Sequence, residues 1–316
     1  MKLFKYQIII VLAVLSILSF TSCKQKPKEN NISVSGAFAL YPLTVKWAEE
    51  YQKLHPEITI DVSAGGAGKG MTDVLSGMVD LAMFSRTVSP EEIKKGAFSI
   101  AVSRDAVVPT INSSNPFIAA IMKQGLSPAQ FADIYVKNKI TVWSQLIPSA
   151  KADKINIYTR SDACGAAEMW AKFLGSNQET LSGTGVFGDP GIADAVKSDK
   201  MGIGYNNVIY AYDTRSRKPY EGINVIPIDI NGNRMIDADE NFYGTLDEIM
   251  DAIANDKYPS PPARDLYLIS KGKPAKKATT DFLNWILSDG QKFVHEAGYV
   301  ALKAEIVKEQ KVKISN

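Results

Sequence analysis

The stretch ISVSGAFALYPLTVKWAEEYQKLHPEITIDVSAGGAGKGMTDVLSGMVDLAMFSR, residues 32–86, decides the fold class. Residues 32–35, 58–62 and 80–84 have the apolar patterns and lengths of strands. Between them, apolar residues recur at helical spacing: Leu43, Trp47, Tyr51 and Leu54 in one helix, and Met71, Val74 and Leu75 in a second. This β-α-β-α-β order predicts an α/β fold with a mostly parallel sheet and helices on its faces.

The remainder of the chain predicts a second α/β unit and a return to the first. Strands are expected at residues 155–159, from residue 202, and at residues 264–270. Helices are marked by three apolar sets: Met169, Trp170, Phe173 and Leu174; Leu246, Ile249, Met250 and Ile253; Phe282, Trp285, Ile286 and Phe293. The chain has 316 residues, which is enough for two domains of ordinary size.

The charge balance argues against nucleic acid as a partner. The formal net charge is +2, and removing Lys2 and Lys5 from the 36 basic residues leaves 34, equal to the 34 acidic residues. The sequence has no basic block of the kind that nucleic-acid-binding proteins carry.

The N-terminus, MKLFKYQIIIVLAVLSILSFTSCKQK, has the features of an export signal. Two lysines precede a short apolar run, residues 8–18, and small residues then lead to Cys23. The segment resembles a bacterial lipobox, so we expect a lipoprotein signal peptide at residues 1–22, a lipidated Cys23 and a polar tether at residues 23–31. An ordinary signal peptide is the alternative. These features predict a lipid-anchored, extracytoplasmic protein of a bacterial cell envelope.

Two loops of the first unit have the composition of anion-binding loops. Residues 35–42 link a strand to a helix, and free amide hydrogens at a helix start attract anions. Residues 63–71, SAGGAGKGM, allow close backbone approach to a ligand. This second loop is not a nucleotide P-loop, because Ser63 and Gly70 occupy positions that need glycine and a hydroxyl residue. Plain connecting loops remain the alternative.

Two arginines follow predicted strands and suit anion capture. Ser85 and Arg86 come directly after the third strand. Arg160 precedes Ser161 and Asp162, residues of N-cap type, and a predicted helix start at residues 163–166. Cys164 at that helix start allows a hydrolase as an alternative, but the sequence offers no clear base beside it, and a packed thiol fits better.

Together these segments resemble the phosphate-binding protein of the phosphate ABC transporter, a type 2 member of the periplasmic binding protein superfamily. The resemblance covers roughly residues 32–302. The segments that carry it are SGAFALYPLTVKWAEEYQKLHP, VSAGGAGKGMTDVLSGMVDLAMFSR, YTRSDACGAAEMW, GIGYNN and ARDLYLISKGKP.

The resemblance implies two α/β lobes joined by two crossovers, with the ligand held in a cleft that closes on it. The implied first lobe comprises residues 32–107 and 264–316, and the second comprises residues 108–263. The implied protein is a monomer that delivers an inorganic oxyanion, phosphate, to a membrane permease. It is not an enzyme and needs no cofactor for chemistry.

Carried over residue by residue, the resemblance predicts a ligand site made of loops from both lobes: Ala37, Phe38, Ala67, Gly68, Ser85, Arg86, Arg160, Cys164, Gly165 and Ala166. At least four hydroxyl donors of the family pattern are missing, because Ala37, Ala67, Cys164 and Ala166 replace serine or threonine. Hydrogen bonds to a charged partner contribute about 1.5–3 kcal/mol each. Arg86, Lys69 and backbone amides would have to compensate. A different anion, or a sensory role without phosphate affinity, therefore stays open.

Residues 229–240, DINGNRMIDADE, match a calcium loop closely. The predicted ligands are Asp229, Asn231, Asn233, the carbonyl of Met235, Asp237 and Glu240. Arg234 departs from the pattern, which has glycine at the sharp turn. The alternative is an Asn-Gly hairpin with charged residues outside. Bound calcium would be structural.

Overall fold

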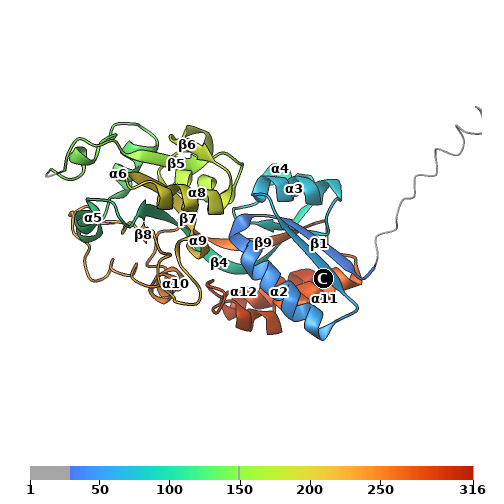
Figure 1. Ribbon diagram of the computed structural model, residues 1–316. Helices are drawn as coiled ribbons and strands as arrows, with labels where there is room; N and C mark the ends of the chain where they lie inside the picture. The colour runs from blue at the N-terminus through green and yellow to red at the C-terminus, as the bar shows by residue number, and fades with distance from the viewer. Residues whose placement is uncertain (1–28, 149, 316) are drawn as a thin grey trace, which may run out of the picture.

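The computed structural model describes residues 29–148 and 150–315. They form two α/β lobes that lie side by side (Figure 1). The predicted signal peptide and Cys23 fall outside these residues. Within the described part of the chain, no helix has the length and apolar character needed to span a membrane.

The first lobe contains one sheet in the order β2-β1-β3-β9-β4. Its strands are β1 (Asn31–Gly36), β2 (Thr59–Ala64), β3 (Leu81–Phe84), the first part of β4 (Ala97–Asn112), and β9 (Ala263–Lys271). Strand β1 pairs in parallel with β2 and β3, and β9 is antiparallel to both β3 and β4. Only β9 therefore runs against the other strands of this lobe, which confirms the mostly parallel sheet.

The helices of the first lobe are α2 (Tyr41–Leu54), α3 (Ala67–Ser76), α4 (Pro90–Lys94), α11 (Lys277–Ile286) and α12 (Ala304–Ser315), with 3-10 turns at Phe38–Leu40 and Asp289–Phe293. Trp47 is fully buried, and its indole nitrogen donates to the carbonyl of Gly290 at 2.8 Å. This bond ties the N-terminal helix α2 to the C-terminal part of the chain. Both termini of the described chain consequently belong to one lobe (Figure 1).

The second lobe has a sheet in the order β4-β7-β5-β6, with β8 also paired to β4. Its strands are the end of β4, β5 (Asn156–Arg160), β6 (Thr184–Val186), β7 (Gly202–Asn207) and β8 (Ile223–Val225). Its helices are α5 (Ile118–Gln124), α6 (Pro128–Tyr135), α7 (Gly165–Phe173), α8 (Gly188–Ser198), α9 (Val208–Ala211) and α10 (Leu246–Ala254), with 3-10 turns at Trp143–Gln145 and Gln178–Thr180. Its core surrounds the fully buried Trp170, whose ring contacts Phe131, Tyr135 and Tyr205.

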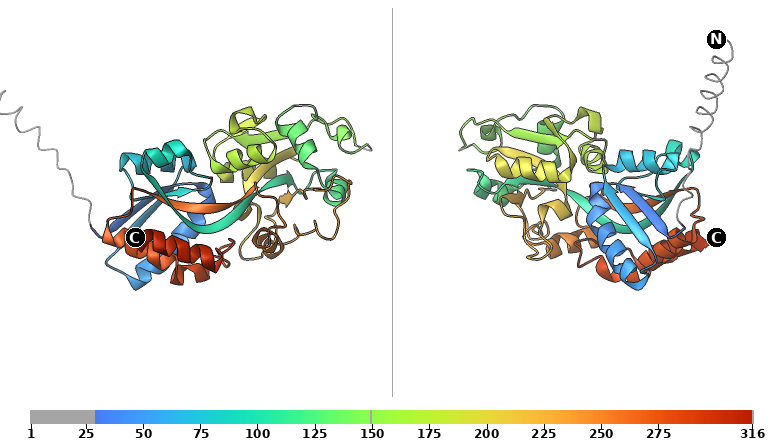
Figure 2. Two further views of the ribbon diagram at one scale, coloured as in Figure 1. Left: turned by 180° about the vertical axis from the view of Figure 1, so that it is seen from behind. Right: turned by 45° about the vertical axis from the view of Figure 1, so that its right-hand side comes forward.

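Two strands connect the lobes, as Figure 2 shows from behind. Strand β4 pairs with β9 as far as Ala106, opposite Ala263, and from Val107 it pairs with β7 instead. The chain returns to the first lobe at the start of β9. Beside this junction, Arg264 pairs with Asp105 on the neighbouring strand at 3.0 Å, and both side chains are buried. Burial raises the pKa of Asp105 to about 6, and the nearby Arg264 opposes that shift.

One sequence prediction of a helix is wrong in its extent. The helix expected to continue through Phe293 ends at Ile286, and Phe293 lies in the following 3-10 turn. Ser288 leaves the helical conformation, with φ −124° and ψ −97°. Gly290 then packs its backbone against Trp285, where a Cβ would lie 3.1 Å from a carbonyl oxygen. The turn thereby places the Gly290 carbonyl for its bond to Trp47.

Candidate functional site

The predicted loops of the first lobe meet where β1 and β3 end. The amide of Ala37 donates to the carbonyl of Met83 at 2.9 Å. Gly36, with φ +130°, packs so closely on Met83 that a Cβ there would overlap the Met83 carbonyl oxygen. The amides of Gly65 and Gly66 both donate to the carbonyl of Gly36. These bonds hold the start of α3 beside the loop that leads into α2.

The start of α3 contacts the start of α7 from the other lobe. The amide of Gly68 donates to the carbonyl of Ala163 at 3.2 Å. A Cβ on Gly165 would overlap the carbonyl oxygen and hydroxyl of Ser85. The first amides of a helix lack partners inside their own helix, so both helix starts carry donors. The structure thus brings Ala67, Gly68, Ser85, Gly165 and Ala166 together between the lobes.

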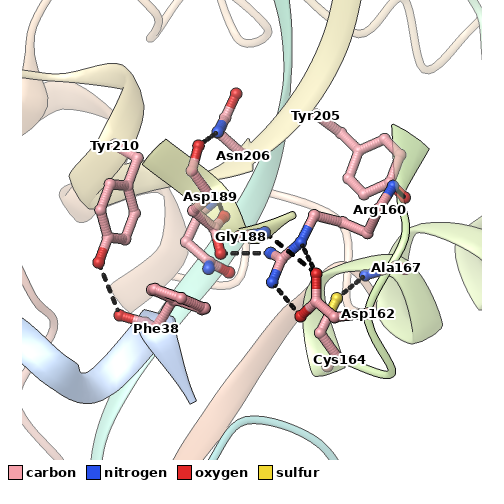
Figure 3. Close-up of polar contacts among 12 residues, drawn as sticks. Phe38, Arg160, Asp162, Cys164, Ala167, Gly188, Asp189, Tyr205, Asn206 and Tyr210 are labelled. Atoms are coloured by element: carbon pink, nitrogen blue, oxygen red, sulfur yellow. Dashed lines mark hydrogen bonds and ion pairs between the residues drawn. The ribbon is translucent and has the colours of Figure 1, made fainter. Parts of the chain in front are cut away.

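Arg160 lies at the centre of this region, and its side chain is only 1% exposed (Figure 3). Its guanidinium donates to both carboxylate oxygens of Asp162, at 2.8 Å and 2.6 Å, and also pairs with Asp189 from the start of α8. It lies 5.6 Å from the ring centroid of Phe38. Burial alone would lower the pKa of Arg160, but the carboxylates of Asp189 and Asp162 raise it, so the guanidinium stays charged.

Arg86 is also paired with carboxylates. It donates to Glu92 at 3.0 Å and 2.7 Å and to the carbonyl of Thr87 at 3.1 Å. Its Nε atom lies 2.9 Å from a carboxylate oxygen of Glu168, which belongs to α7 of the second lobe. Each of the two predicted anion-binding arginines therefore already faces two carboxylates of the chain itself.

Cys164 is the N-cap of α7, and its sulfur accepts a hydrogen bond from the amide of Ala167 at 3.4 Å. The prediction that Ser161 or Asp162 caps this helix is wrong, because Asp162 is turned toward Arg160 instead. Burial raises the pKa of the Cys164 thiol to about 12, although Arg160 opposes the shift. A reactive cysteine needs a lowered pKa, so these surroundings do not suit a nucleophile.

The positions without hydroxyl groups are buried. Ala37, Ala67 and Ala166 are each at most 2% exposed. A ligand between the lobes would therefore meet small methyl groups at these three positions, and no side-chain hydroxyl donors. The aromatic rings of Phe38 and Phe187, one from each lobe, contact edge to face with centroids 5.7 Å apart.

A polar cavity of about 470 Å³ opens beside the two helix starts. Its walls come from both lobes and include Gly68, Arg86, Cys164, Glu168, Lys172 and Gln178. Gln178 is fixed there, since its side chain donates to the carbonyl of Asp162 and accepts from the amide of Cys164. The predicted loops contribute Gly68, Arg86 and Cys164 to this cavity, and most of the rest of its wall comes from α7 and the segment that follows it.

Sequence reasoning missed the acidic partners of both arginines and the role of Arg264. Asp162 follows Arg160 by only two residues, and the chain bends directly after β5, which brings the two side chains together. Asp189, Glu92 and Glu168 lie farther from their arginines in the sequence and carry no such signal. Arg264 donates to the carbonyl of Gly165 at 2.7 Å and pairs with Asn207, which joins the strand junction to the start of α7.

The predicted calcium loop does not bring its carboxylates together as a metal site in the structure. No group of three or more His, Cys, Asp or Glu side chains in the described residues is placed to hold a metal ion. The carboxylates accept hydrogen bonds from backbone amides of the loop instead: Asp229 from Gly232 at 2.8 Å, and Glu240 from Ile230 at 2.8 Å. Arg234 does adopt the left-handed conformation, with φ +65°, that favours glycine at the sharp turn.

Comparison with known proteins identifies relatives over most of the chain. Residues 22–290 match the model of the PBP superfamily domain. The phosphate-binding protein PstS of Methanocaldococcus jannaschii is 28% identical, covering 91% of this chain and 86% of that protein. SphX of Synechococcus elongatus is 24% identical, covering 87% of this chain and 78% of that protein.

Solved structures show the same fold. A protein from Clostridium perfringens, provisionally named as a phosphate ABC transporter substrate-binding protein and solved with bound phosphate, has a TM-score of 0.70 at 20% identity, covering 87% of this chain and 100% of that chain. An ABC-type phosphate transport receptor from Vibrio cholerae has a TM-score of 0.62 at 20% identity, covering 86% and 100% respectively. At these identities the likeness supports the two-lobed architecture.

Proposed function

The chain belongs to the PBP superfamily, and we propose that it is a lipid-anchored, extracytoplasmic solute-binding protein of an ABC transporter. It captures an inorganic oxyanion, with phosphate first among them, between its lobes and presents it to a membrane permease. It does so as a monomer and without chemistry on the ligand. We propose lobe boundaries at residues 107–108 and 263–264, within one residue of the points where β4 changes its strand partner and β9 begins.

The observation that carries this proposal is the meeting of two helix starts from different lobes beside Arg160. Helix starts bind anions through free amides and the helix dipole. In the closed arrangement Gly68 contacts Ala163, and Gly165 contacts Ser85. The amides behind these contacts become accessible to an anion when the lobes separate. Lobe opening exposes the amide donors, and closure around the anion shields it from water.

A second function is favoured by the pairing of both arginines with carboxylates. A site that already satisfies Arg160 and Arg86 internally suits a protein that senses or binds a partner without tight anion binding. The buried alanines at positions 37, 67 and 166 also favour this second function, because they offer no hydroxyl donors to an anion. The two functions differ in one measurable property, which is the affinity for small oxyanions.

Thermal unfolding in the presence of different anions separates these functions. For the soluble form that begins at Lys24, we expect phosphate to raise the Tm, because a ligand at 100 times its Kd stabilises the folded state by about 2.7 kcal/mol. That corresponds to a Tm shift of roughly 4–5 °C, because the entropy of unfolding is about 2.1 cal/mol/K per residue. Sulfate, arsenate and molybdate test specificity, and sodium chloride at equal ionic strength is the control. A Tm that responds to no oxyanion more than to chloride would favour the partner-binding function.

Lipid attachment at Cys23 is tested separately. The full chain expressed in bacteria should fractionate with membranes and incorporate labelled palmitate. Cys23→Ala should remove the label and release the protein from the membrane, because dual acylation anchors a protein and the tether alone does not. Cys164→Ala is the matched control and should keep the label. Label retained in Cys23→Ala would refute the anchor.

Calcium binding by residues 229–240 stays a prediction. After treatment with a chelator, added calcium should raise the Tm by several degrees, because binding to the folded state alone stabilises it. Glu240→Gln removes the expected bidentate ligand and should abolish the calcium-dependent shift. Glu240 also accepts hydrogen bonds from two loop amides, so we expect the substitution to lower the Tm even without calcium. The quantity to compare is therefore the change in Tm when calcium is added. If calcium raised the Tm of the unaltered chain and of Glu240→Gln equally, residues 229–240 would not be the calcium site.

A further inference from the structure

Arg86 is held in place by its own lobe. Glu92 accepts two hydrogen bonds from its guanidinium, and the ring of Phe84 lies 4.4 Å from its central carbon. Burial alone would raise the pKa of Glu92, but hydrogen bonds from Arg86 and from the amide of Ser89 lower it. Glu92 is therefore a firm partner that fixes the arginine at the end of β3.

Glu168 is a different kind of partner. It reaches Arg86 from the other lobe, with the carboxylate 2.9 Å from Nε, and 44% of its side chain remains exposed. Burial raises the pKa of Glu168, and the attraction of Arg86 does not overcome that shift. Because the carboxylate is partly exposed to solvent, water screens its ion pair with Arg86, and ion pairs of this kind contribute little to stability.

We propose that Glu168 is a residue that sets the affinity of the anion site, because its carboxylate occupies the position on Arg86 that an anionic ligand takes and binding requires its displacement. The inference rests on the proposed function, since it assigns an internal competitor to the same anion site. Arg86 lines the cavity between the lobes together with Glu168 and Lys172. An anion in this cavity meets Glu168 at the arginine before it can pair there.

The displaced carboxylate has a second partner available. Lys172 follows Glu168 by four residues on α7, a spacing at which a glutamate and a lysine attract each other along a helix surface. Both side chains line the cavity, and Lys172 is exposed. Glu168 can therefore turn from Arg86 to Lys172 when an anion arrives, which limits the charge repulsion between the carboxylate and the ligand.

Such an internal competitor lowers the affinity of every anion by the same factor. That factor is set by the fraction of molecules in which Arg86 is not paired with Glu168. Weak binders such as chloride then fail to occupy the site at their ordinary concentrations. A tight-binding oxyanion still does. Glu168 thus sets a threshold of affinity, and the ligand class is an oxyanion that makes several strong contacts with the loops at once.

Calorimetric titration of phosphate into Glu168→Gln tests the inference, with Glu179→Gln as the matched control. Glu179 lines the same cavity and is exposed, but it makes no ion pair with Arg86 in the described structure. We expect Glu168→Gln to bind phosphate about five- to tenfold more tightly than the unaltered chain, and Glu179→Gln to stay within about twofold.

The possible failures are distinguishable. Phosphate binding by the unaltered chain with no change, or a loss, in Glu168→Gln overturns the inference and leaves the proposed function standing. Equal tightening in both variants also overturns it, because general charge repulsion would then be the cause. Binding that appears only in Glu168→Gln supports it. Absence of binding by all three proteins overturns the proposed function and the inference together.

Discussion

Replacing Arg160 with methionine is expected to lower the free energy of unfolding by about 3–5 kcal/mol, the cost of removing one partner from a buried ion pair. Asp189 is 1% exposed and the side chain of Asp162 is 9% exposed. Without the guanidinium, two carboxylates would remain close together with little water around them. Urea denaturation of the soluble form measures the effect.

A second substitution isolates the cause. Asp189→Asn in the Arg160→Met background removes one of the stranded charges, and we expect it to restore part of the lost stability. Lys53→Ala is the matched control, since Lys53 is an exposed cation that pairs with Glu50 on the surface of α2, and its loss should leave the free energy of unfolding nearly unchanged. If Arg160→Met and Lys53→Ala lowered the free energy of unfolding equally, the ion pairs of Arg160 would not be the buried, stabilising contacts described above.

Replacing Gly165 with alanine is expected to weaken phosphate binding by at least about 100-fold, the scale of loss that a displacement of about 1 Å produces at a preorganised site. The new methyl group would overlap the Ser85 carbonyl of the opposite lobe, so the lobes could not close fully. Alanine is a better helix former than glycine, and Gly165 begins α7. The fold of the second lobe should therefore be kept.

Gly191→Ala is the control for this variant. Gly191 lies in α8, and an added methyl group would meet only Val186 of the same lobe, at 2.8 Å. Small-angle X-ray scattering should show a larger radius of gyration for Gly165→Ala than for Gly191→Ala when phosphate is present. An equal radius and equal affinity in the two variants would mean that contact between Gly165 and Ser85 is not part of the ligand-bound state.

The first lobe was predictable because its information is local. The apolar spacing of Leu43, Trp47 and Tyr51 and the break at His55-Pro56 define α2, and the structure ends this helix at Leu54. The glycines of residues 63–71 predict the loop that opens α3. These signals depend on residues that are close in sequence, so no knowledge of the packed chain is needed.

Strand β4 was not predictable in the same way. It carries Pro109 in its interior, a residue that normally argues against a central strand. In the structure Pro109 lies opposite Tyr205 of β7, its carbonyl accepts a bond from the amide of Ile226, and the strand changes partner shortly before it. The crossover between lobes depends on pairing with β7 and β9, which lie far away in the sequence.

The charge state of the site was also hidden from the sequence. Arg160 and Arg86 each suggest anion capture when considered alone. Their partners Asp189 and Glu168 come from other elements, 29 residues from Arg160 and on the opposite lobe from Arg86 respectively. Only the packed structure shows that both arginines already form ion pairs with carboxylates of the chain. This is why the fold follows from the sequence more readily than the ligand does.

Calorimetric titration of phosphate into the ligand-free protein that begins at Lys24 tests the central claim most directly. We expect saturable binding at one site with a Kd of about 1 μM or below, which is a binding free energy of about −8 kcal/mol or more negative. Backbone amides at the two helix starts and the closure of the lobes would then replace the missing hydroxyl donors. A titration without saturable heat would contradict the proposal that the protein captures phosphate. The fold would then serve as a scaffold for another ligand.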